Sequence, residues 1–311
     1  MKGLFLDASE ELAAVLRTVS HGADPAVDVN VQAHVDPAEL AGLLGGYGFA
    51  LNDHTFMPTG AMQAVAAAGL RHVIFLGTGA RSYMNPEELA GLGIEVHTIK
   101  GYGDTAVAEH AVALMWDAAR GLARMDRGVR QGGWPRREGM QLAGKTVGLL
   151  GYGGIAAEVA RIARGIGMRV LAWNRTPRVA DGVEFVPLDR LLAESHVLSV
   201  HLLLTDGTRG FLDAARIAAM RPGAILVNTA RGAVVDEAAM IDALQRGHLA
   251  HAGLDVFDQE PLPPGHPLAA LENVTLSAHS AFRTPEASET LIRRALDIAV
   301  QVAGAAQVAR A

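Results

Sequence analysis

Short apolar runs alternate with amphipathic stretches along the first 97 residues. The runs are rich in Val, Ile, Leu and Phe and have the length of strands, whereas the stretches repeat their apolar residues with helical spacing. Strands joined by helices in this way are typical of a parallel α/β sheet. The predicted strands cover residues 4–6, 27–31, 49–51, 72–76 and 94–98, and the predicted helices cover residues 10–19, 37–44, 59–68 and 86–92.

The same alternation starts again at Lys145 and continues to residue 277. It predicts a second α/β unit of the doubly wound, nucleotide-binding kind. Its strands are expected at residues 146–150, 169–173, 196–201, 224–228, 252–255 and 274–277, and its helices at 155–165, 188–193, 213–219 and 237–245. The fold class is therefore α/β, with two Rossmann-like, doubly wound parallel-sheet domains.

Two further helices lie outside these alternating units. Residues 105–130 carry apolar side chains along one face over an unusual length. We expect an element between domains or protomers there, with a simple core helix as the alternative. Residues 285–302 follow the second unit, and we expect this last helix to return to the first domain.

Composition and charge exclude several classes of protein. The 311 residues are 50% hydrophobic with a net charge of −6, and no basic run exceeds two residues, so no nucleic-acid partner is expected. Cysteine is absent, which excludes disulfides and thiolate metal sites. No apolar stretch approaches the roughly 18 residues of a membrane span, and Asp7 interrupts the apolar start too early for a signal peptide. We expect a cytoplasmic protein without a metal site, since the twelve histidines lack ligand spacing.

A glycine-rich loop, Gly151-Tyr152-Gly153-Gly154-Ile155-Ala156, follows an apolar strand and opens a predicted helix. Gly151 allows a tight turn, Gly153 lets the backbone approach a pyrophosphate, and the helix N-terminus offers free amides. The loop therefore predicts a dinucleotide site with contacts from Gly151, Gly153, Gly154 and Ile155. A purely structural glycine turn is the alternative.

The strand after this loop ends in Asn174-Arg175-Thr176, without the carboxylate that would hold the ribose diol of NAD. The positive charge of Arg175 would attract a 2′-phosphate. We therefore predict that NADP(H) is preferred over NAD(H), with Asn174, Arg175 and Thr176 as cofactor contacts. The alternative is an NAD enzyme in which Asn174 alone bonds the ribose and Arg175 is solvated.

Arg231, Glu260 and His279 each follow an apolar run near the C-terminus. The guanidinium fork of Arg231 suits the carboxylate of a keto acid, and His279 is suited to carry a proton near neutral pH. Glu260 would fix the tautomer of His279 through a hydrogen bond. Each residue alone fits a solvated loop equally well, but the three in this order behind a nucleotide loop predict hydride and proton transfer on a 2-keto acid.

These motifs resemble those of the D-isomer-specific 2-hydroxyacid dehydrogenase family, which includes glyoxylate/hydroxypyruvate reductases. The resemblance implies a substrate-binding, flavodoxin-like domain of residues 1–97 plus 281–311, a dinucleotide-binding domain of residues 98–280, and a substrate cleft between them. It also implies a homodimer built through the nucleotide domain. The segments that carry it are Gly77-Thr78-Gly79, Val107-Ala108-Glu109-His110, the glycine-rich loop, Asn228-Thr229-Ala230-Arg231-Gly232, Gly253-Leu254-Asp255-Val256-Phe257 with Glu260-Pro261, and His279.

The resemblance also implies a role for individual residues. Arg231 and His279 would bind the substrate, His279 would act as the acid/base, and Glu260 would be its partner. Asp255 would hold the nicotinamide carboxamide. The backbone amides of Thr78 and Gly79 would meet the substrate carboxylate, and Thr78, Thr229 and Ala230 would also contact the cofactor.

Two loops depart from the family's pattern. Arg81 stands where many members have an aspartate, so it is a candidate for holding a second acidic group of the substrate, with a solvent-facing side chain as the alternative. The segment around His279, Ser277–Arg283, lacks a preceding proline and is closer to D-lactate dehydrogenases and C-terminal binding proteins. His54, Phe56 and Met57 are further candidates for substrate contact, with an ordinary loop as the alternative.

Two hypotheses about function follow from this pattern. The first is an NADPH-dependent reductase of a small 2-keto acid such as glyoxylate or hydroxypyruvate. The second is a dinucleotide-sensing regulator similar to the corepressors, in which the same fold binds cofactor to control assembly. The intact trio of Arg231, Glu260 and His279 favours the enzyme.

Overall fold

The computed structural model describes residues 1–32, 34–176 and 178–308, with side chains described up to residue 305. The chain forms two compact units, one made of Met1–Gly103 with Thr284–Ala311 and the other of Asp104–Arg283. The sequence predicts these divisions after residues 97 and 280, and residues 309–311 of the predicted first domain lie outside the described residues.

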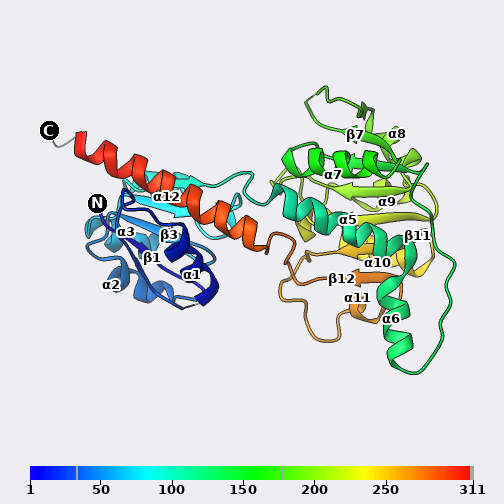
Figure 1. Ribbon diagram of the computed structural model, residues 1–311, viewed down its shortest axis with the longest axis horizontal. Coiled ribbons are helices and arrows are strands. Elements are labelled where there is room, and N and C mark those ends of the chain that lie inside the picture. Colours follow the sequence, from blue (N-terminus) through cyan, green and yellow to red (C-terminus); the bar gives the residue numbers. More distant parts are fainter. Residues whose placement is uncertain (33, 177, 309–311) are drawn as a thin grey trace. The chain divides into compact units, whose positions relative to one another are not determined.

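The first unit contains a five-stranded parallel sheet in the order β2-β1-β3-β4-β5 (Figure 1). Successive strand residues fill two cores: Val73 and Phe75 point into one, and Ile74 into the other. The elements are β1 (Gly3–Phe5), α1 (Glu10–Val19), β2 (Val27–Val29), η1 (Pro37–Glu39), α2 (Leu40–Leu44), β3 (Phe49–Asn52), α3 (Thr59–Ala67), β4 (His72–Phe75), η2 (Ala80–Ser82), α4 (Pro86–Gly91) and β5 (Glu95–Thr98).

The last helix, α12 (Pro285–Val308), belongs to the first unit, which confirms the expected return of the chain (Figure 1). Leu291, Ile292 and Leu296 are buried in the core that also contains residues of α1. Arg293 forms a 2.7 Å ion pair with Asp24. Apolar burial and this half-buried pair together fix the helix against α1.

The second unit contains a seven-stranded parallel sheet in the order β12-β11-β10-β9-β6-β7-β8 (Figure 1). The order reverses between β6 and β9, and in such sheets the carboxyl ends of the strands at the reversal bind nucleotides. The elements are β6 (Thr146–Leu150), α7 (Gly154–Gly165), β7 (Arg169–Trp173), β8 (Glu184–Phe185), α8 (Leu188–Glu194), β9 (Val197–Val200), α9 (Ala214–Ala218), β10 (Ala224–Asn228), η3 (Gly232–Val234), α10 (Glu237–Gln245), β11 (Leu249–Leu254), α11 (Pro267–Ala270) and β12 (Val274–Leu276). The predicted fold class is therefore confirmed.

The prediction of one continuous helix over residues 105–130 is wrong. The segment forms α5 (Asp104–Arg120) and α6 (Leu122–Arg130), which are separated by Gly121 in the left-handed region at φ 68°. Asp117 accepts a 2.6 Å hydrogen bond from the Ala123 amide and so caps the start of α6. The apolar periodicity continues through the break, which is why the sequence pattern conceals it. No described helix is both long and apolar enough to cross a membrane.

The sequence pattern does not predict the short elements β8 and α11. β8 has two residues and α11 has four, so both are too short to show the apolar periodicity of a strand or a helix. Sheet pairing with β7 defines β8, and Pro267 together with the His266 side chain starts α11. Both elements depend on neighbours that the local pattern does not contain.

A buried histidine connects β11, β12 and α5. His251 is 2% exposed, and its Nε2 lies 2.8 Å from the Thr275 hydroxyl, which in turn donates to Asp117. Its Nδ1 has no partner among the described residues. Burial lowers the pKa of His251 to about 4, although the charge of Asp117 opposes this shift. The imidazole is therefore held neutral.

We predict that His251 makes the second unit sensitive to mild acid. In the unfolded chain its pKa is near the ordinary 6.5, so unfolding takes up a proton below that pH. The stabilisation is complete above pH 6.5 and is lost as the pH falls towards 4. Urea unfolding at pH 7 and pH 5 should show a loss of roughly 2 kcal/mol from this group.

The variant His251→Gln provides the control, because glutamine can still donate to Thr275 but does not titrate. Its free energy of unfolding should fall less between pH 7 and pH 5 than that of the wild type. Equal losses in the two proteins would remove His251 as the cause.

Candidate functional site

Arg231, Glu260 and His279 come from three strands that are neighbours in one sheet. They follow β10, β11 and β12, which pair in that order and run parallel. Because the carboxyl ends of parallel strands meet at one edge, the three connecting segments gather there. The structure therefore brings the predicted trio to one edge of the second unit.

His279 and Glu260 form the shortest polar link of this edge. His279 Nδ1 lies 2.6 Å from Glu260 Oε2, and Oε1 of the same carboxylate accepts from the Phe257 amide at 2.9 Å. Burial alone would raise the pKa of Glu260, but the hydrogen bonds from His279 and Phe257, with the charges of His279 and Arg231, hold this pKa below its usual range. An ionised carboxylate only accepts, so Nδ1 carries the proton and Nε2 is left to exchange one.

Asp255 holds the backbone that carries His279. Its side chain is fully buried, and its two oxygens accept from the Ser277 hydroxyl at 2.6 Å and from the amides of Ser280 and Ala281 at 3.0 and 2.9 Å. Its backbone carbonyl accepts from the His279 amide at 2.8 Å. These bonds surround His279, whose φ of 48° is in the left-handed region. Such a conformation is costly for a residue with a Cβ atom, so the turn requires these anchors.

A histidine of α5 completes this anchor. His110 Nε2 lies 2.8 Å from the Ser277 hydroxyl and 3.4 Å from Asp255 Oδ1. Burial raises the pKa of Asp255, but the hydrogen bonds from His110, Ser277, Ser280 and Ala281 outweigh burial and lower it to about 2. Asp255 is therefore a carboxylate across the whole neutral range.

Sequence reasoning missed this positioning network. The nicotinamide contact of Asp255 stays a prediction, and the structure adds that both oxygens of Asp255 bind groups around His279. His110 and Ser277 lay within the motifs already noted, but their roles depend on contact between α5 and β12. The signal in the chain was the motif Val107-Ala108-Glu109-His110, which places His110 on a helix.

The loop that carries Arg231 is tied by Asn228. The Asn228 side chain accepts from the Ala230 amide and donates to the Arg231 carbonyl, both at 3.0 Å. Arg231 Nη1 donates to the Ala230 carbonyl at 2.7 Å. The next residue, Gly232, packs directly on the backbone of Phe257, where a Cβ atom would collide. The loop after β10, which bears Arg231, therefore packs tightly against the loop after β11, which leads to Glu260.

Thr229 lies beside Arg231 with 8% of its surface exposed. Its hydroxyl has no partner among the described residues. A buried hydroxyl without a partner costs roughly 1–3 kcal/mol, so this group is suited to bond a ligand that reaches the loop. The Ala230 amide, by contrast, is already occupied by Asn228.

The glycine-rich loop has the geometry of a phosphate site. Gly151 has φ 92°, and a Cβ atom there would lie 2.8 Å from the His201 carbonyl oxygen. Gly154 opens α7 and packs on the Asp104 carboxylate, which leaves no room for a side chain. Gly153 is exposed with open space around it, and no side chain caps the helix start at Gly154 and Ile155. The residues present therefore fit a dinucleotide pyrophosphate.

Asn174 joins the end of β7 to this loop. Its Oδ1 accepts from the Tyr152 amide at 3.2 Å, and its Nδ2 donates to the Thr176 carbonyl at 2.8 Å. The Arg175 side chain is exposed and forms no ion pair within the described part of the chain. Asn174 therefore shapes the turn, while Arg175 projects its charge into solvent.

The candidate residues of the first unit lie after β3 and β4. Thr78 is exposed, and the amides of Thr78 and Gly79 make no hydrogen bond within the described residues. Arg81 is 70% exposed and pairs with Glu87, which agrees with the solvent-facing alternative.

The loop after β3 is fixed by Asp7, which sequence reasoning did not single out. The carboxylate of Asp7 accepts from the amides of Asp53, His54 and Thr55 at 2.7–2.8 Å. Burial raises the pKa of Asp7, and these amide bonds oppose the shift. Met57 is fully buried in the core, which matches the alternative of an ordinary loop for that residue.

The chain is similar to known proteins in both sequence and fold. A family model described as "D-isomer specific 2-hydroxyacid dehydrogenase, NAD binding domain" matches residues 112–281. The glyoxylate reductase of Aeropyrum pernix is 42% identical over 229 residues, which cover 70% of this chain and 68% of that protein. The TT0316 protein from Thermus thermophilus has a TM-score of 0.82 at 34% identity, covering 96% of this chain and 94% of its own. The D-lactate dehydrogenase from Escherichia coli has a TM-score of 0.85 at 27% identity, covering 96% and 95%.

These matches agree with the two parallel-sheet α/β units of the structure. The matched model spans more than half of the chain and is a dinucleotide-binding domain. Two of these relatives are named as enzymes, so the comparisons give no support to the alternative of a dinucleotide-sensing regulator. The chain belongs to the D-isomer specific 2-hydroxyacid dehydrogenase family and is a D-2-hydroxyacid dehydrogenase that uses a nicotinamide dinucleotide.

Proposed function

We propose that this enzyme is an NADPH-dependent reductase of a small 2-keto acid of the glyoxylate or hydroxypyruvate type. The 2.6 Å contact between His279 and Glu260 carries the proposal, because it leaves His279 Nε2 as the proton-exchanging atom at the sheet edge that also bears Arg231. The similarity to a glyoxylate reductase supports the substrate class.

In the proposed chemistry, Arg231 supplies positive charge and His279 supplies a proton. Arg231 binds the substrate carboxylate through its guanidinium fork and polarises the keto oxygen. His279 donates its proton to that oxygen as it becomes an alkoxide, and the ionised Glu260 stabilises the positive charge of His279 before transfer. In the first unit, the free amides of Thr78 and Gly79 are the proposed donors to the substrate carboxylate.

The cofactor supplies the hydride, which no side chain can provide. The residues that would hold it are those of the phosphate loop, Gly151 to Ile155, with Thr229 contributing its unpartnered hydroxyl. Asp255 acts through His279 in this proposal, because its oxygens are already used by the turn.

The preference for NADPH rests on the end of β7. No carboxylate stands there, and the exposed Arg175 follows at once. Asn174 already uses its carbonyl and amide groups within the turn. A 2′-phosphate would meet the exposed guanidinium, which is worth roughly 1.5–3 kcal/mol for a charged hydrogen bond.

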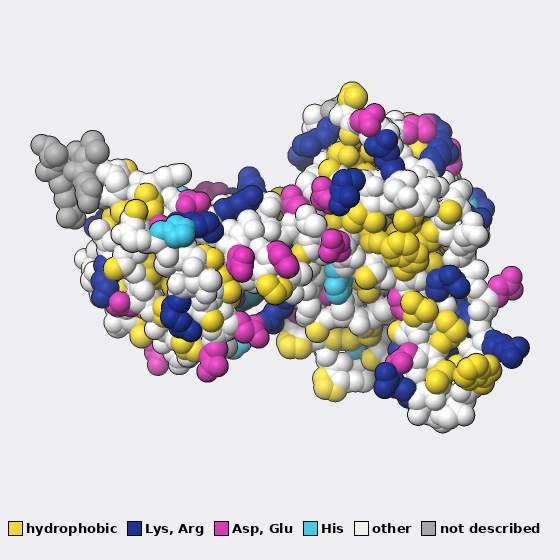
Figure 2. All heavy atoms as spheres, viewed as in Figure 1, with side chains coloured by type: hydrophobic (Ala, Val, Ile, Leu, Met, Phe, Trp, Pro, Cys, Tyr) yellow, Lys and Arg dark blue, Asp and Glu magenta, His cyan; other side chains and the backbone are white. Residues whose placement is uncertain are grey.

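The homodimer is proposed through α5 and α6. No side chain of α6 is buried within the chain, and Leu122, Val129 and Trp134 are 53%, 49% and 75% exposed. Figure 2 shows hydrophobic side chains on the surface over α5 and α6. Apolar side chains gathered on and beside one projecting helix are typical of a surface that a second copy covers.

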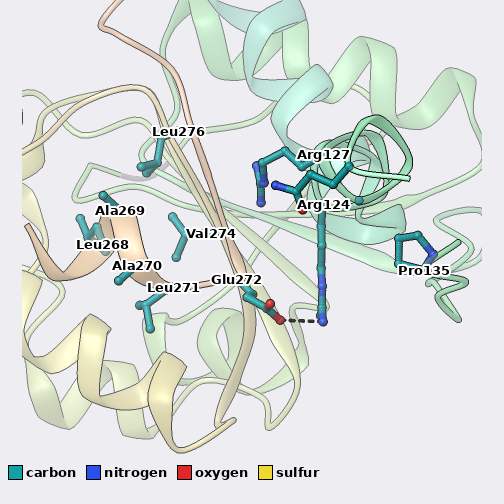
Figure 3. A pocket seen from close by; sticks show the side chains of 12 residues that line it. Arg124, Arg127, Pro135, Leu268, Ala269, Ala270, Leu271, Glu272, Val274 and Leu276 are labelled. Atoms are coloured by element: carbon teal, nitrogen blue, oxygen red, sulfur yellow. Dashed lines mark ion pairs between the residues drawn. The ribbon is translucent and has the colours of Figure 1, made fainter. Parts of the chain in front are cut away.

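A hollow of about 540 Å³ separates α6 from α11 and β12 (Figure 3). Arg124 and Arg127 of α6 line one side of it, and apolar residues of α11 and β12 line the other. A 2.6 Å ion pair between Arg124 and Glu272 crosses this space. Since α6 stands off its own unit, a partner has apolar surface to bury there.

The reductase proposal predicts turnover in an NADPH-oxidation screen over glyoxylate, hydroxypyruvate, pyruvate, phenylpyruvate and dicarboxylic keto acids. Small keto acids should react fastest. His279→Ala should lower kcat by about 2–4 decades while NADPH binding, followed by its fluorescence, stays unchanged, because only proton transfer is lost. A loss of less than a few-fold would exclude His279 from the mechanism.

The cofactor preference is tested by Arg175→Ala. We expect kcat/KM for NADPH to fall about 10- to 100-fold with little change for NADH, since only the contact to the 2′-phosphate is removed. Arg17→Ala, which removes an exposed arginine from α1, should leave both values unchanged. A wild-type enzyme that prefers NADH tenfold would contradict the proposal.

The dimer is tested by light scattering on Val129→Asp. A charge in a buried apolar interface is costly, so this variant should dissociate into monomers at concentrations where the wild type is a dimer. Val31→Asp, on an exposed valine of the first unit, is the matched control and should not change the mass. A monomeric wild type would exclude the proposed interface.

A further inference from the structure

Two histidines and a glutamate meet at the amino ends of β4 and β5, away from the site described above. His72 is the first residue of β4 and pairs in register with Glu95, the first residue of β5. His97 follows Glu95 by two positions on the same strand, so both side chains lie on one face. Ile74 and Ile99 continue that face into the core that contains residues of α1 and α12.

The three side chains turn their ligand atoms towards one another. His72 Nδ1 lies 3.2 Å from His97 Nε2 and 3.6 Å from Glu95 Oε2, and His97 Nε2 lies 3.8 Å from the same oxygen. Around a tetrahedral Zn²⁺ with bonds of about 2.0–2.2 Å, ligand atoms stand roughly 3.3–3.5 Å apart. The observed spacings differ from this by only a few tenths of an ångström.

The burial of the two histidines and the position of Glu95 also suit metal binding. The imidazoles are 18% and 19% exposed, whereas Glu95 is 67% exposed. The two nearly buried imidazoles and the more exposed carboxylate of Glu95 thus place three ligand atoms around one point.

We propose that His72, Glu95 and His97 bind one divalent transition-metal ion of the Zn²⁺ type, with water in the fourth position. Two imidazoles and one carboxylate form a donor set that Zn²⁺ accepts in proteins. The ion would link β5, the edge strand of the sheet, to its single neighbour β4. Its role is structural, because the cluster lies at the opposite end of β4 from Gly77-Thr78-Gly79.

The expectation of no metal site rested on spacing along the chain. Glu95 and His97 have the two-residue spacing that places ligands on one face of a strand, but the third ligand comes from a neighbouring strand. Sheet register joins them, and register is not visible in the sequence. The competing explanation is a hydrogen-bonded imidazole pair without a metal.

The test uses the untagged full chain after treatment with a chelator. Calorimetric titration with ZnCl₂ at pH 7.5 should show one ion per chain with micromolar or tighter Kd. Co²⁺ should give the visible absorption of a tetrahedral site. At a hundredfold excess of Zn²⁺ over Kd, Tm of the first unit should rise by roughly 10 °C.

Three variants decide whether the ion binds at this cluster. His97→Asn and Glu95→Gln should each weaken Zn²⁺ binding at least tenfold, whereas His34→Ala, an exposed histidine of the same unit, should bind as the wild type does. Circular dichroism without metal checks folding, and the exposed Glu95 keeps the test decisive if His97→Asn does not fold. No Zn²⁺ binding by the wild type, or equal binding by all variants, would overturn the proposal.

Discussion

The turn that carries His279, the proposed proton donor, depends on one buried carboxylate. Asp255 accepts three hydrogen bonds from Ser277, Ser280 and Ala281, and His110 lies beside it. Hydrogen bonds to a charged group contribute roughly 1.5–3 kcal/mol each. A left-handed residue costs roughly 1–2 kcal/mol, so these bonds outweigh the strain at His279. The imidazole can therefore be presented to Glu260 from a backbone conformation that few residues adopt.

Side-chain hydrogen bonds to nearby backbone groups also hold the neighbouring loops. Asn228 ties the turn before Arg231, and Asn174 ties the phosphate loop to the end of β7. Gly232 and Gly154 remove the side chains that would separate elements meeting at these loops. The turns that carry Arg231 and the phosphate loop are thus held by internal hydrogen bonds and close packing.

The first unit separates two kinds of chemistry by the direction of its strands. The unpartnered amides of Thr78 and Gly79 follow the carboxyl end of β4, where loops diverge and backbone donors are free. The cluster of His72, Glu95 and His97 lies at the amino ends of β4 and β5. The proposed substrate donors and the proposed metal ligands therefore lie at opposite ends of one parallel sheet.

The sequence by itself determined the fold class, the phosphate loop and the three strand-end residues. These features are local: apolar periodicity fixes strands and helices, and glycine spacing fixes a loop. Tertiary structure alone decided the break at Gly121, the anchoring role of Asp255 with His110 and Ser277, and the meeting of His72 with Glu95 and His97. Each of these features depends on which strands pair and which helix packs on them. A local sequence pattern does not specify the distance in space between residues that are remote in the chain.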